Sequence, residues 1–285
     1  MVRPDDTGRE AEDVVGSGSE DVVGGDSTPS EHVADWDAAR YHRVAANQEE
    51  WGREVLARLE LKGDETVLDA GCGSGRVTRL LAERLPEGRV IGVDGSPSML
   101  EEAKANLAGF ADSLELVLAD LVQLDLHEAV DAVFSNATFH WIGDHHRLFE
   151  RLFAALRPGG ALEAQCGGEG NVAEWERAVE SVAGDERFAP YFRDLGRPWN
   201  FASAGDTHSR LERAGFEVKR VWLERRTVDP PDEREYVRAV GLARHLPRLP
   251  EEAREDFIDT VLGSMLRPLR LEYVRLNMSA RKPGP

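Results

Sequence analysis

The sequence predicts an α/β protein built on a mostly parallel sheet with helices on both faces. Short apolar runs alternate with amphipathic helical patterns over most of the chain that follows the first 50 residues. A glycine-rich turn joins the first predicted strand to its helix, and several later strands end in polar residues. In a sheet of this kind, ligands bind at the carboxyl ends of the strands, where such loops gather.

The stretch from Thr66 to Leu80, TVLDAGCGSGRVTRL, is typical of a strand, a turn and a helix in succession. Val67 and Leu68 form the apolar run, and Asp69 closes it. Glycines at alternate positions allow positive φ angles and let a ligand approach the bare backbone. These glycines are Gly71, Gly73 and Gly75.

Polar residues close the next predicted strands. Asp94 follows the strand Arg89–Val93, where a carboxylate can accept both hydroxyls of a ribose, and Asp120 follows Leu114–Leu118, where it can bind an adenine amino group. The spacing from the turn to Asp94 also fits a dinucleotide fold. The turn, D-A-G-C-G-S-G, departs from G-x-G-x-x-G, and its leading acid would repel a pyrophosphate. A cationic ligand is therefore expected.

The segment VLDAGCGSG resembles the first motif of the class I S-adenosylmethionine-dependent methyltransferases, and four ordered motifs carry the resemblance from about Trp36 to Lys282. It implies a Rossmann-like, seven-stranded sheet with an antiparallel last strand, S-adenosyl-L-methionine as cofactor and S-adenosyl-L-homocysteine as product. The residues that it assigns to the cofactor are Tyr41, Asp69, Gly71, Cys72, Gly73, Asp94, Gly95, Ser96, Met99, Asp120, Leu121, Asn136 and Ala137.

Three parts of the chain are expected around this motif set. Residues 1–34 hold nine acidic residues against two arginines and are predicted to be a disordered acidic tail. Residues 35–282 form the methyltransferase domain, with an N-terminal lid at about 35–50 and helical cap segments at about 170–205 and 231–267 over the substrate pocket. The predicted elements of the second half are helices at Asn171–Ala183, Asp206–Ala214, Glu233–Leu246 and Glu251–Leu266, and strands at Ala161–Gln165, Glu217–Val228 and Glu272–Ala280.

The composition of the chain limits the kinds of partner that it is expected to bind. A formal charge of −18 argues against a general nucleic-acid binder, which needs clustered cations for phosphates. Cys72 and Cys166 have no metal-ligand spacing, and no bound metal is expected. No secretory signal or membrane-length apolar run is found, so a cytoplasmic protein without membrane contact is predicted. The expected partner is a small-molecule substrate, and the protein is expected to be a monomer or a homodimer.

The methyl acceptor is the open question, and His140, Trp141 and Gln48 are the candidate catalytic residues. The segment SNATFHWI, with the lid and the cap, resembles the carboxyl O-methyltransferases, most closely the trans-aconitate methyltransferase group. Trp141 offers one N–H donor and Gln48 two, enough to hold a carboxylate. A carboxylate is ionised at neutral pH and needs no general base. The acceptor is thus expected to be a small polycarboxylic, fatty or terpenoid acid.

Other readings stay open. O-, N- or C-methylation of a natural product would use His140 as general base, and a non-catalytic cofactor-binding protein is a third possibility. In the cap, a cationic surface would suit a di- or tricarboxylate, whereas inward apolar residues would suit a fatty or terpenoid acid. The cationic set is Arg238, Arg244, His245 and Arg248, and the apolar set is Val240, Leu242 and Leu246. His145 and His146 are expected on the surface, and Cys72 is expected to pack.

Overall fold

A single sheet of seven strands forms the centre of the molecule, in the order β3-β2-β1-β4-β5-β7-β6. The computed structural model describes residues 46–196 and 199–285, with side chains from Glu49 onward. Strands β1 to β5 are parallel, and β7 runs antiparallel to both of its neighbours. The strands are β1 (Thr66–Ala70), β2 (Arg89–Asp94), β3 (Leu114–Leu118), β4 (Val130–Asn136), β5 (Leu156–Gly167), β6 (Glu217–Val228) and β7 (Leu271–Arg281). The predicted fold class is confirmed.

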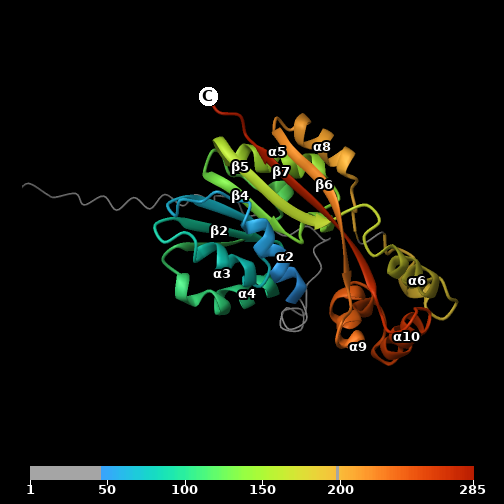
Figure 1. The fold of residues 1–285 in the computed structure, drawn as a ribbon. Helices are drawn as coiled ribbons and strands as arrows, with labels where there is room; N and C mark the ends of the chain where they lie inside the picture. The colour runs from blue at the N-terminus through green and yellow to red at the C-terminus, as the bar shows by residue number, and fades with distance from the viewer. Residues whose placement is uncertain (1–45, 197–198) are drawn as a thin grey trace, which may run out of the picture.

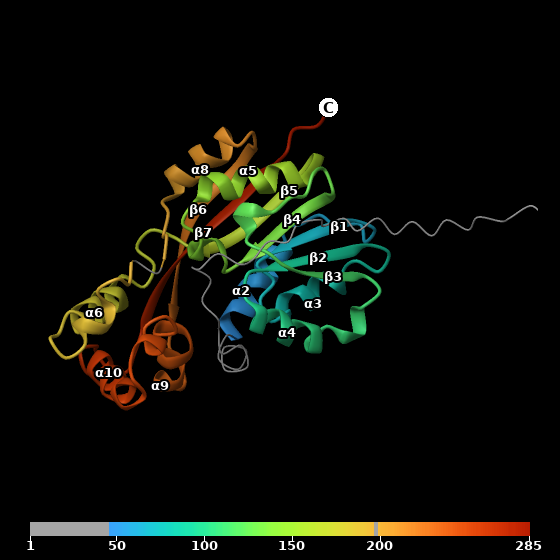
Figure 2. The same ribbon diagram turned by 180° about the vertical axis from the view of Figure 1, so that it is seen from behind.

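Helices cover both faces of the sheet (Figures 1 and 2). On one face lie α2 (Ala46–Leu56), α3 (Arg76–Ala82) and α4 (Pro97–Asn106), and on the other lie α5 (His145–Ala155) and α8 (Ala204–Arg213). Each face buries its own apolar cluster, because parallel strands present side chains alternately to the two sides.

The remaining helices gather beyond the carboxyl ends of the parallel strands, where β6 and β7 extend past the sheet (Figures 1 and 2). We call this group the helical lobe. It has an apolar core of its own, to which Trp175, Val237 and Phe257 belong. Its elements are α6 (Ala173–Ala183), α7 (Ala189–Phe192), α9 (Glu233–Tyr236), the π-helical turn η4 (Val237–Gly241), the 3-10 turn η5 (Leu246–Arg248) and α10 (Glu251–Gly263).

The boundary between α5 and β5 differs from the prediction. The helix ends at Ala155, before the proline and glycines, but the strand begins at Leu156 and not at Ala161. The reason is pairing: Leu156 is in register with Val130 of β4, and the Gly159 amide donates to the carbonyl of Lys282. Neighbouring strands therefore draw the predicted loop into the sheet.

The single helix predicted over Glu233–Leu246 is wrong, because the segment consists of one α-helical turn, the turn η4 and irregular turns. Gly241 explains part of the difference. A Cβ atom at Gly241 would lie 2.6 Å from the indole of Trp175, so the backbone passes directly against that ring. Packing against α6 sets the path of this segment in place of helical periodicity.

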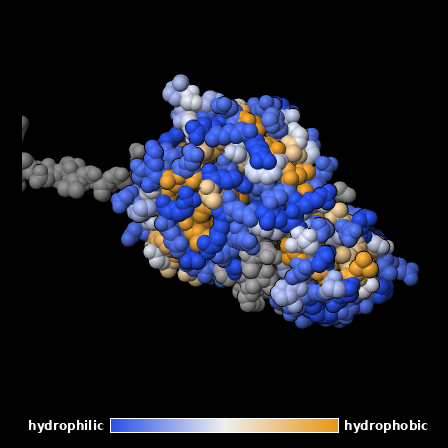
Figure 3. Space-filling model, in the orientation of Figure 1, coloured by the Kyte–Doolittle hydropathy of each residue, from blue (hydrophilic) through white to orange (hydrophobic). Residues whose placement is uncertain are grey.

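The described surface is mainly hydrophilic on the face in Figure 3, with apolar side chains in limited patches. No helix in the described ranges has the length and apolar character needed to cross a bilayer.

The core between the sheet and α5 provides a test of the fold. Phe149 is fully buried there and packs its ring edge against Phe139 at a centroid distance of 6.0 Å. Phe149→Ala is expected to lower the free energy of unfolding by about 3–5 kcal/mol, since it leaves a cavity. Urea denaturation measures this loss. The control Leu266→Ala removes a side chain that is 90% exposed and should change stability by no more than about 0.5 kcal/mol. Equal effects would contradict the packing.

Candidate active site

The glycine turn after β1 leaves bare backbone at the carboxyl edge of the sheet. All three glycines have positive φ angles, 88° at Gly71, 54° at Gly73 and 81° at Gly75. A Cβ atom at Gly71 would lie 2.2 Å from the side chain of Thr138, which follows β4. A Cβ atom at Gly73 would meet nothing within 4 Å. The turn is therefore tightly packed at its start and open to a ligand at Gly73.

Asp94 fixes this turn to the end of β2. One of its carboxylate oxygens accepts the amide of Gly73 at 2.9 Å, and the other accepts the amide of Ser96 at 2.9 Å. Burial raises the pKa of Asp94, although these backbone donors oppose the rise. Gly95 lies between Asp94 and Ser96, in the bend before α4. The carboxylate is thus preorganised by its own neighbours.

Asp69 lies deeper, with 2% of its surface exposed. The hydroxyl of Thr78, in α3, donates to its carboxylate at 2.8 Å. Burial raises the pKa of Asp69 to about 7, and the nearby charge of Asp94 adds to the rise. Asp69 is therefore a buried carboxyl behind the turn whose ionisation a nearby cation would favour.

The next predicted contacts line the same edge. The Ser96 side chain caps α4 by accepting the amide of Met99, and Pro97 begins the helix, as predicted. Met99 is buried. Asp120 caps the short turn η2 (Leu121–Gln123) by accepting the amide of Val122, and Leu121 is buried beside it.

A cavity opens between this edge of the sheet and the helical lobe. The space between its walls, counted together with the open solvent at its mouth, is about 770 Å³. Ala137, with a φ of 58°, and its neighbours His140 and Trp141 line the side near β4, whereas Trp175 and Val240 line it from the lobe. Most of the lining is aromatic or aliphatic, including Trp51, Trp141, Val172, Trp175, Trp199, Phe201, Tyr236, Val237, Val240, Leu271, Tyr273 and Val274.

His140 is held in one tautomer by the end of β5. Its Nδ1 accepts the backbone amide of Gly167 at 3.2 Å, so the neutral ring carries its proton on Nε2. Its ring lies against those of Trp141 and Phe201, with centroids 5.1 and 5.8 Å away. Burial lowers the pKa of His140 to about 3, and the charge of His145 contributes. The imidazole is therefore a neutral hydrogen-bond donor and a very weak base.

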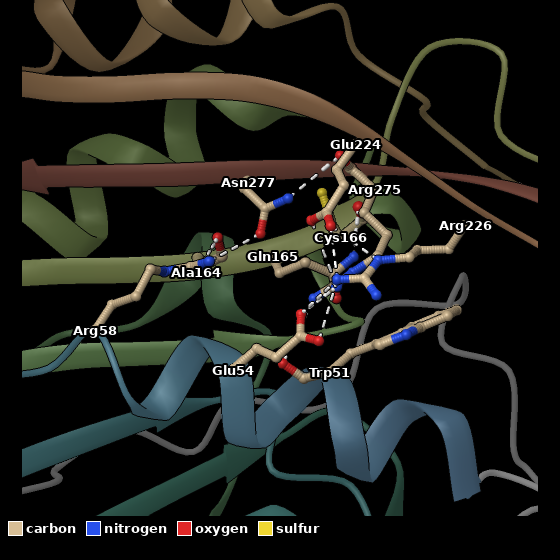
Figure 4. A network of polar contacts seen from close by, with 10 residues as sticks. All are labelled: Trp51, Glu54, Arg58, Ala164, Gln165, Cys166, Glu224, Arg226, Arg275 and Asn277. Atoms are coloured by element: carbon tan, nitrogen blue, oxygen red, sulfur yellow. Dashed lines mark hydrogen bonds and ion pairs between the residues drawn. The ribbon is translucent and has the colours of Figure 1, made fainter.

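The cationic side chain on the cavity wall, Arg275, is itself neutralised. Its side chain is 1% exposed. The guanidinium lies 2.6 Å from the carboxylate of Glu54 and 3.6 Å from that of Glu224, and its central carbon lies over the ring of Trp51, 5.0 Å from the centroid. Arg226 bridges the same two glutamates. Figure 4 shows Glu54 and Trp51 reaching from α2 toward the arginines of β6 and β7. Among the described residues that line the cavity, Arg275 is the only arginine or lysine.

The cationic set expected in the cap does not line this cavity, since none of its four members, Arg238, Arg244, His245 and Arg248, belongs to the lining. Arg238 pairs with Glu255 of α10, Arg248 is exposed, and His245 is buried against Phe192 and Phe257. Burial lowers the pKa of His245 to about 4. Of the alternative apolar set, Val240 lines the cavity, whereas Leu242 and Leu246 are buried in the lobe's core.

His145 was expected on the surface, and this is wrong. It is 3% exposed, and its Nε2 lies 2.8 Å from the carbonyl of Phe139. This bond ties the first turn of α5 to the segment that carries His140, whereas His146 is exposed as predicted. Cys72 is buried, as expected of a packing residue.

Two predicted residues, Tyr41 and the side chain of Gln48, lie outside the described part of the structure. The cavity also includes residues that sequence reasoning missed, namely Trp51, Gln165, Trp175, Tyr236, Tyr273 and Arg275. A signal existed for Arg275, since it interrupts the apolar strand EYVRLNM at an inward position. Two of these lining residues, Tyr236 and Tyr273, form a hydrogen bond between their hydroxyl groups at 2.7 Å.

This strand order, with a glycine turn after β1 and an acid at the end of β2, is that of the class I S-adenosylmethionine-dependent methyltransferases, and the chain belongs to this family. Residues 67–160 match the family model described as a methyltransferase domain. The trans-aconitate 2-methyltransferase of Methylobacterium radiotolerans is 35% identical over 239 residues, covering 80% of this chain and 87% of the relative. That of Escherichia coli O157:H7 is 30% identical over 262 residues, covering 88% and 99%. The protein is thus a methyltransferase of small molecules with S-adenosyl-L-methionine as cofactor.

Solved structures show the same fold. A Bacillus halodurans structure described as a putative methyltransferase has a TM-score of 0.57 and 20% identity, covering 81% of this chain and 98% of that one. Phosphoethanolamine N-methyltransferase 2 of Haemonchus contortus, in complex with S-adenosyl-L-methionine, has a TM-score of 0.58 and 21% identity, covering 86% and 56%. At these identities the likeness concerns the fold alone.

The raised pKa of Asp69 predicts how stability depends on pH. Between about pH 4, the usual pKa of an Asp, and pH 7, the folded state keeps a proton that the unfolded state has lost. The free energy of unfolding should therefore fall as pH rises through this window. Urea denaturation of the wild type and of Asp69→Asn, without cofactor, measures the difference. Asp69→Asn should become more stable relative to the wild type as pH rises, and parallel curves would contradict the assignment.

Proposed function

We propose that this methyltransferase forms methyl esters, by transferring the methyl group of S-adenosyl-L-methionine to a carboxylate of a small acid with a largely apolar body. The state of His140 carries this proposal. A hydroxyl or amine acceptor must lose a proton, whereas a carboxylate is already ionised at neutral pH. His140, with a pKa of about 3 and its Nδ1 occupied by the Gly167 amide, suits the orientation of an anion and not proton abstraction.

The residues near the glycine turn fit the cofactor. The backbone at Gly71, Cys72 and Gly73 would face its methionine part, and open space beside Gly73 allows this approach. Asp69, behind the turn, would stabilise positive charge there. The other contacts follow the sequence assignment: Asp94, Gly95 and Ser96 for the ribose, Met99, Asp120 and Leu121 for the adenine, and Asn136 and Ala137 beside the reacting centre. The cofactor supplies an electrophilic methyl group on a sulfonium.

The task left to the protein is alignment and exclusion of water. Donors on the β4 side of the cavity, Nε2 of His140 and the indole of Trp141, would orient the reacting carboxylate, together with Gln48 from the lid. The aromatic walls would keep water from it. We take the helical lobe as the cap over this pocket, because it supplies Trp175, Tyr236 and Val240 to the cavity lining.

The cavity favours one carboxylate over three. The two relatives reported above carry the name of a tricarboxylate substrate, trans-aconitate, but here the cation on the cavity wall faces two glutamates. The second and third carboxylates of a tricarboxylate would lose their hydration near these glutamates. This loss costs free energy, because no unpaired cation is there among the described lining residues to compensate for it. Fatty or terpenoid acids match the apolar lining better, so we prefer them to polycarboxylic acids.

A methyl-transfer screen tests this function. The purified protein and S-adenosyl-L-methionine are incubated with fatty acids, terpenoid acids and trans-aconitate, with phenols and amines as contrast. Mass spectrometry should find methyl esters, with a kcat/KM at least about tenfold higher for an apolar acid than for trans-aconitate, since the second and third carboxylates lose hydration. Methylation restricted to phenols or amines would refute the proposal.

Two substitutions at His140 distinguish its role as a hydrogen-bond donor from a role as a general base. The amide nitrogen of His140→Gln can take the place of Nε2–H, whereas His140→Phe keeps only an aromatic ring. Ester formation should fall by roughly 10- to 100-fold in His140→Phe, the value of a hydrogen bond to a charged group, and by much less in His140→Gln. Steady-state kinetics between pH 6 and pH 9 gives both comparisons.

Cofactor affinity by calorimetry is the control, and neither variant should change it greatly. The wild-type rate should not follow an ionisation near neutral pH that His140→Gln removes. If both variants are equally inactive and the wild type shows such an ionisation, His140 acts as a base.

A further inference from the structure

Three buried polar atoms without a partner in the described structure belong to residues that line the cavity. The indole N–H of Trp175, the side-chain oxygen of Gln165 and the Nε of Arg275 have no hydrogen-bond partner among the described residues. Their side chains are 3%, 2% and 1% exposed. Atoms of this kind also occur away from the cavity, on Arg151 and Thr207. Because buried polar groups are almost always paired in folded proteins, the three atoms at the cavity are those that a bound ligand could pair with.

The orientation of the Gln165 amide is determined by its neighbour. Its nitrogen donates to the carbonyl of Cys166 at 2.8 Å, which identifies the remaining atom as the acceptor oxygen. Gln165 lies near the end of β5, two residues before Gly167, whose amide donates to His140. Its side chain also belongs to the lining of the cavity.

Trp175 lines the cavity from the helical lobe, where it packs against Gly241. Its indole rests on the bare backbone of Gly241, where an added Cβ would approach the ring to 2.6 Å and its nitrogen to 3.2 Å. The ring belongs to the core of the lobe, yet it also lines the cavity. An indole N–H only donates, so its partner must be an acceptor.

Arg275 differs from these two because most of its guanidinium is engaged. Glu54 and Glu224 hold it by charge, and it stacks on Trp51, which makes it part of the wall. The unmatched pair is therefore the donor of Trp175 and the acceptor of Gln165.

We propose that Trp175 and Gln165 are specificity-determining residues that recognise hydroxyl groups on the body of the acceptor, apart from the carboxylate that is methylated. A hydroxyl both accepts and donates, so hydroxylated acids satisfy the two side chains, whereas a plain hydrocarbon acid leaves both unpaired. A site built to bind a hydroxyl discriminates strongly against analogues without one. This inference rests on the proposed carboxyl methylation and names its substrate class as hydroxy acids.

Kinetics with matched acids tests it. Dodecanoic acid is compared with derivatives that carry one hydroxyl at the middle or at the end of the chain, and the readout is the ratio of kcat/KM for the best hydroxy acid to that for dodecanoic acid. The wild type should give a ratio of about ten or more. Trp175→Phe keeps an aromatic ring but removes the donor, and Gln165→Met keeps the length of the side chain but removes the acceptor. Each should bring the ratio close to one.

A matched control is Trp222→Phe, the same substitution in β6 at a residue that does not line the cavity, where Arg58 and Arg220 lie over the ring. Its ratio should equal that of the wild type. Cofactor affinity and thermal unfolding of each variant show that the protein is folded, and the ratio does not depend on the fraction of active enzyme.

The outcomes are distinct. A wild-type ratio near one, or a high ratio that persists in both Trp175→Phe and Gln165→Met, overturns the hydroxyl recognition while ester formation stands. If no acid is methylated although the cofactor binds, the proposed carboxyl methylation fails, and the hydroxyl recognition fails with it.

Discussion

A buried arginine links the parts of this molecule that make the cavity. Arg275 is almost fully buried, and a charge in such a place is tolerated only with close partners of opposite sign. Those partners come from α2, as Glu54, and from β6, as Glu224, so the ion pairs join a helix near the start of the described chain to two strands near its end. The stacked Trp51 completes the arrangement. Where these elements meet, they close one wall of the cavity.

The two acids near the glycine turn, Asp69 and Asp94, are held by neutral partners. Both carboxylate oxygens of Asp94 accept backbone amides, and the carboxylate of Asp69 accepts the hydroxyl of Thr78. None of these hydrogen-bond donors is a cationic side chain. Burial raises the pKa of both carboxyls. A cationic ligand beside the turn would relieve that cost, which is the electrostatic reason why such a turn suits a sulfonium better than a phosphate.

Backbone also governs the reacting centre. The Gly167 amide leaves His140 as a donor, and a bond between His145 and the Phe139 carbonyl anchors the segment that presents it. An orienting imidazole, an aromatic enclosure and a neutralised arginine are consistent with a reaction that needs alignment more than proton transfer. In the function that we propose, the helical lobe selects among acceptors, because Trp175 and its neighbours form the far wall of the cavity.

The sequence by itself determined the parts that depend on local order. Glycines at alternate positions, Asp94 at a strand end, the Ser96–Pro97 helix start and the bounds of β6 were all predicted and are confirmed, since each follows from propensity, capping or strand periodicity within a short segment. Only the tertiary structure decided which distant side chains meet. Arg275 and Glu54 are 221 positions apart, and no periodicity relates them.

Packing also overruled local pattern in the second half of the chain. The segment after Glu233 has a helical pattern, yet contact between Gly241 and Trp175 breaks it into turns. Arg238 turns to Glu255, and His145 is buried although its position predicted exposure. In each case the direction of a side chain depends on the neighbour that a remote segment provides. The sequence therefore predicted the glycine turn, whereas the tertiary structure alone defined the cavity beside it.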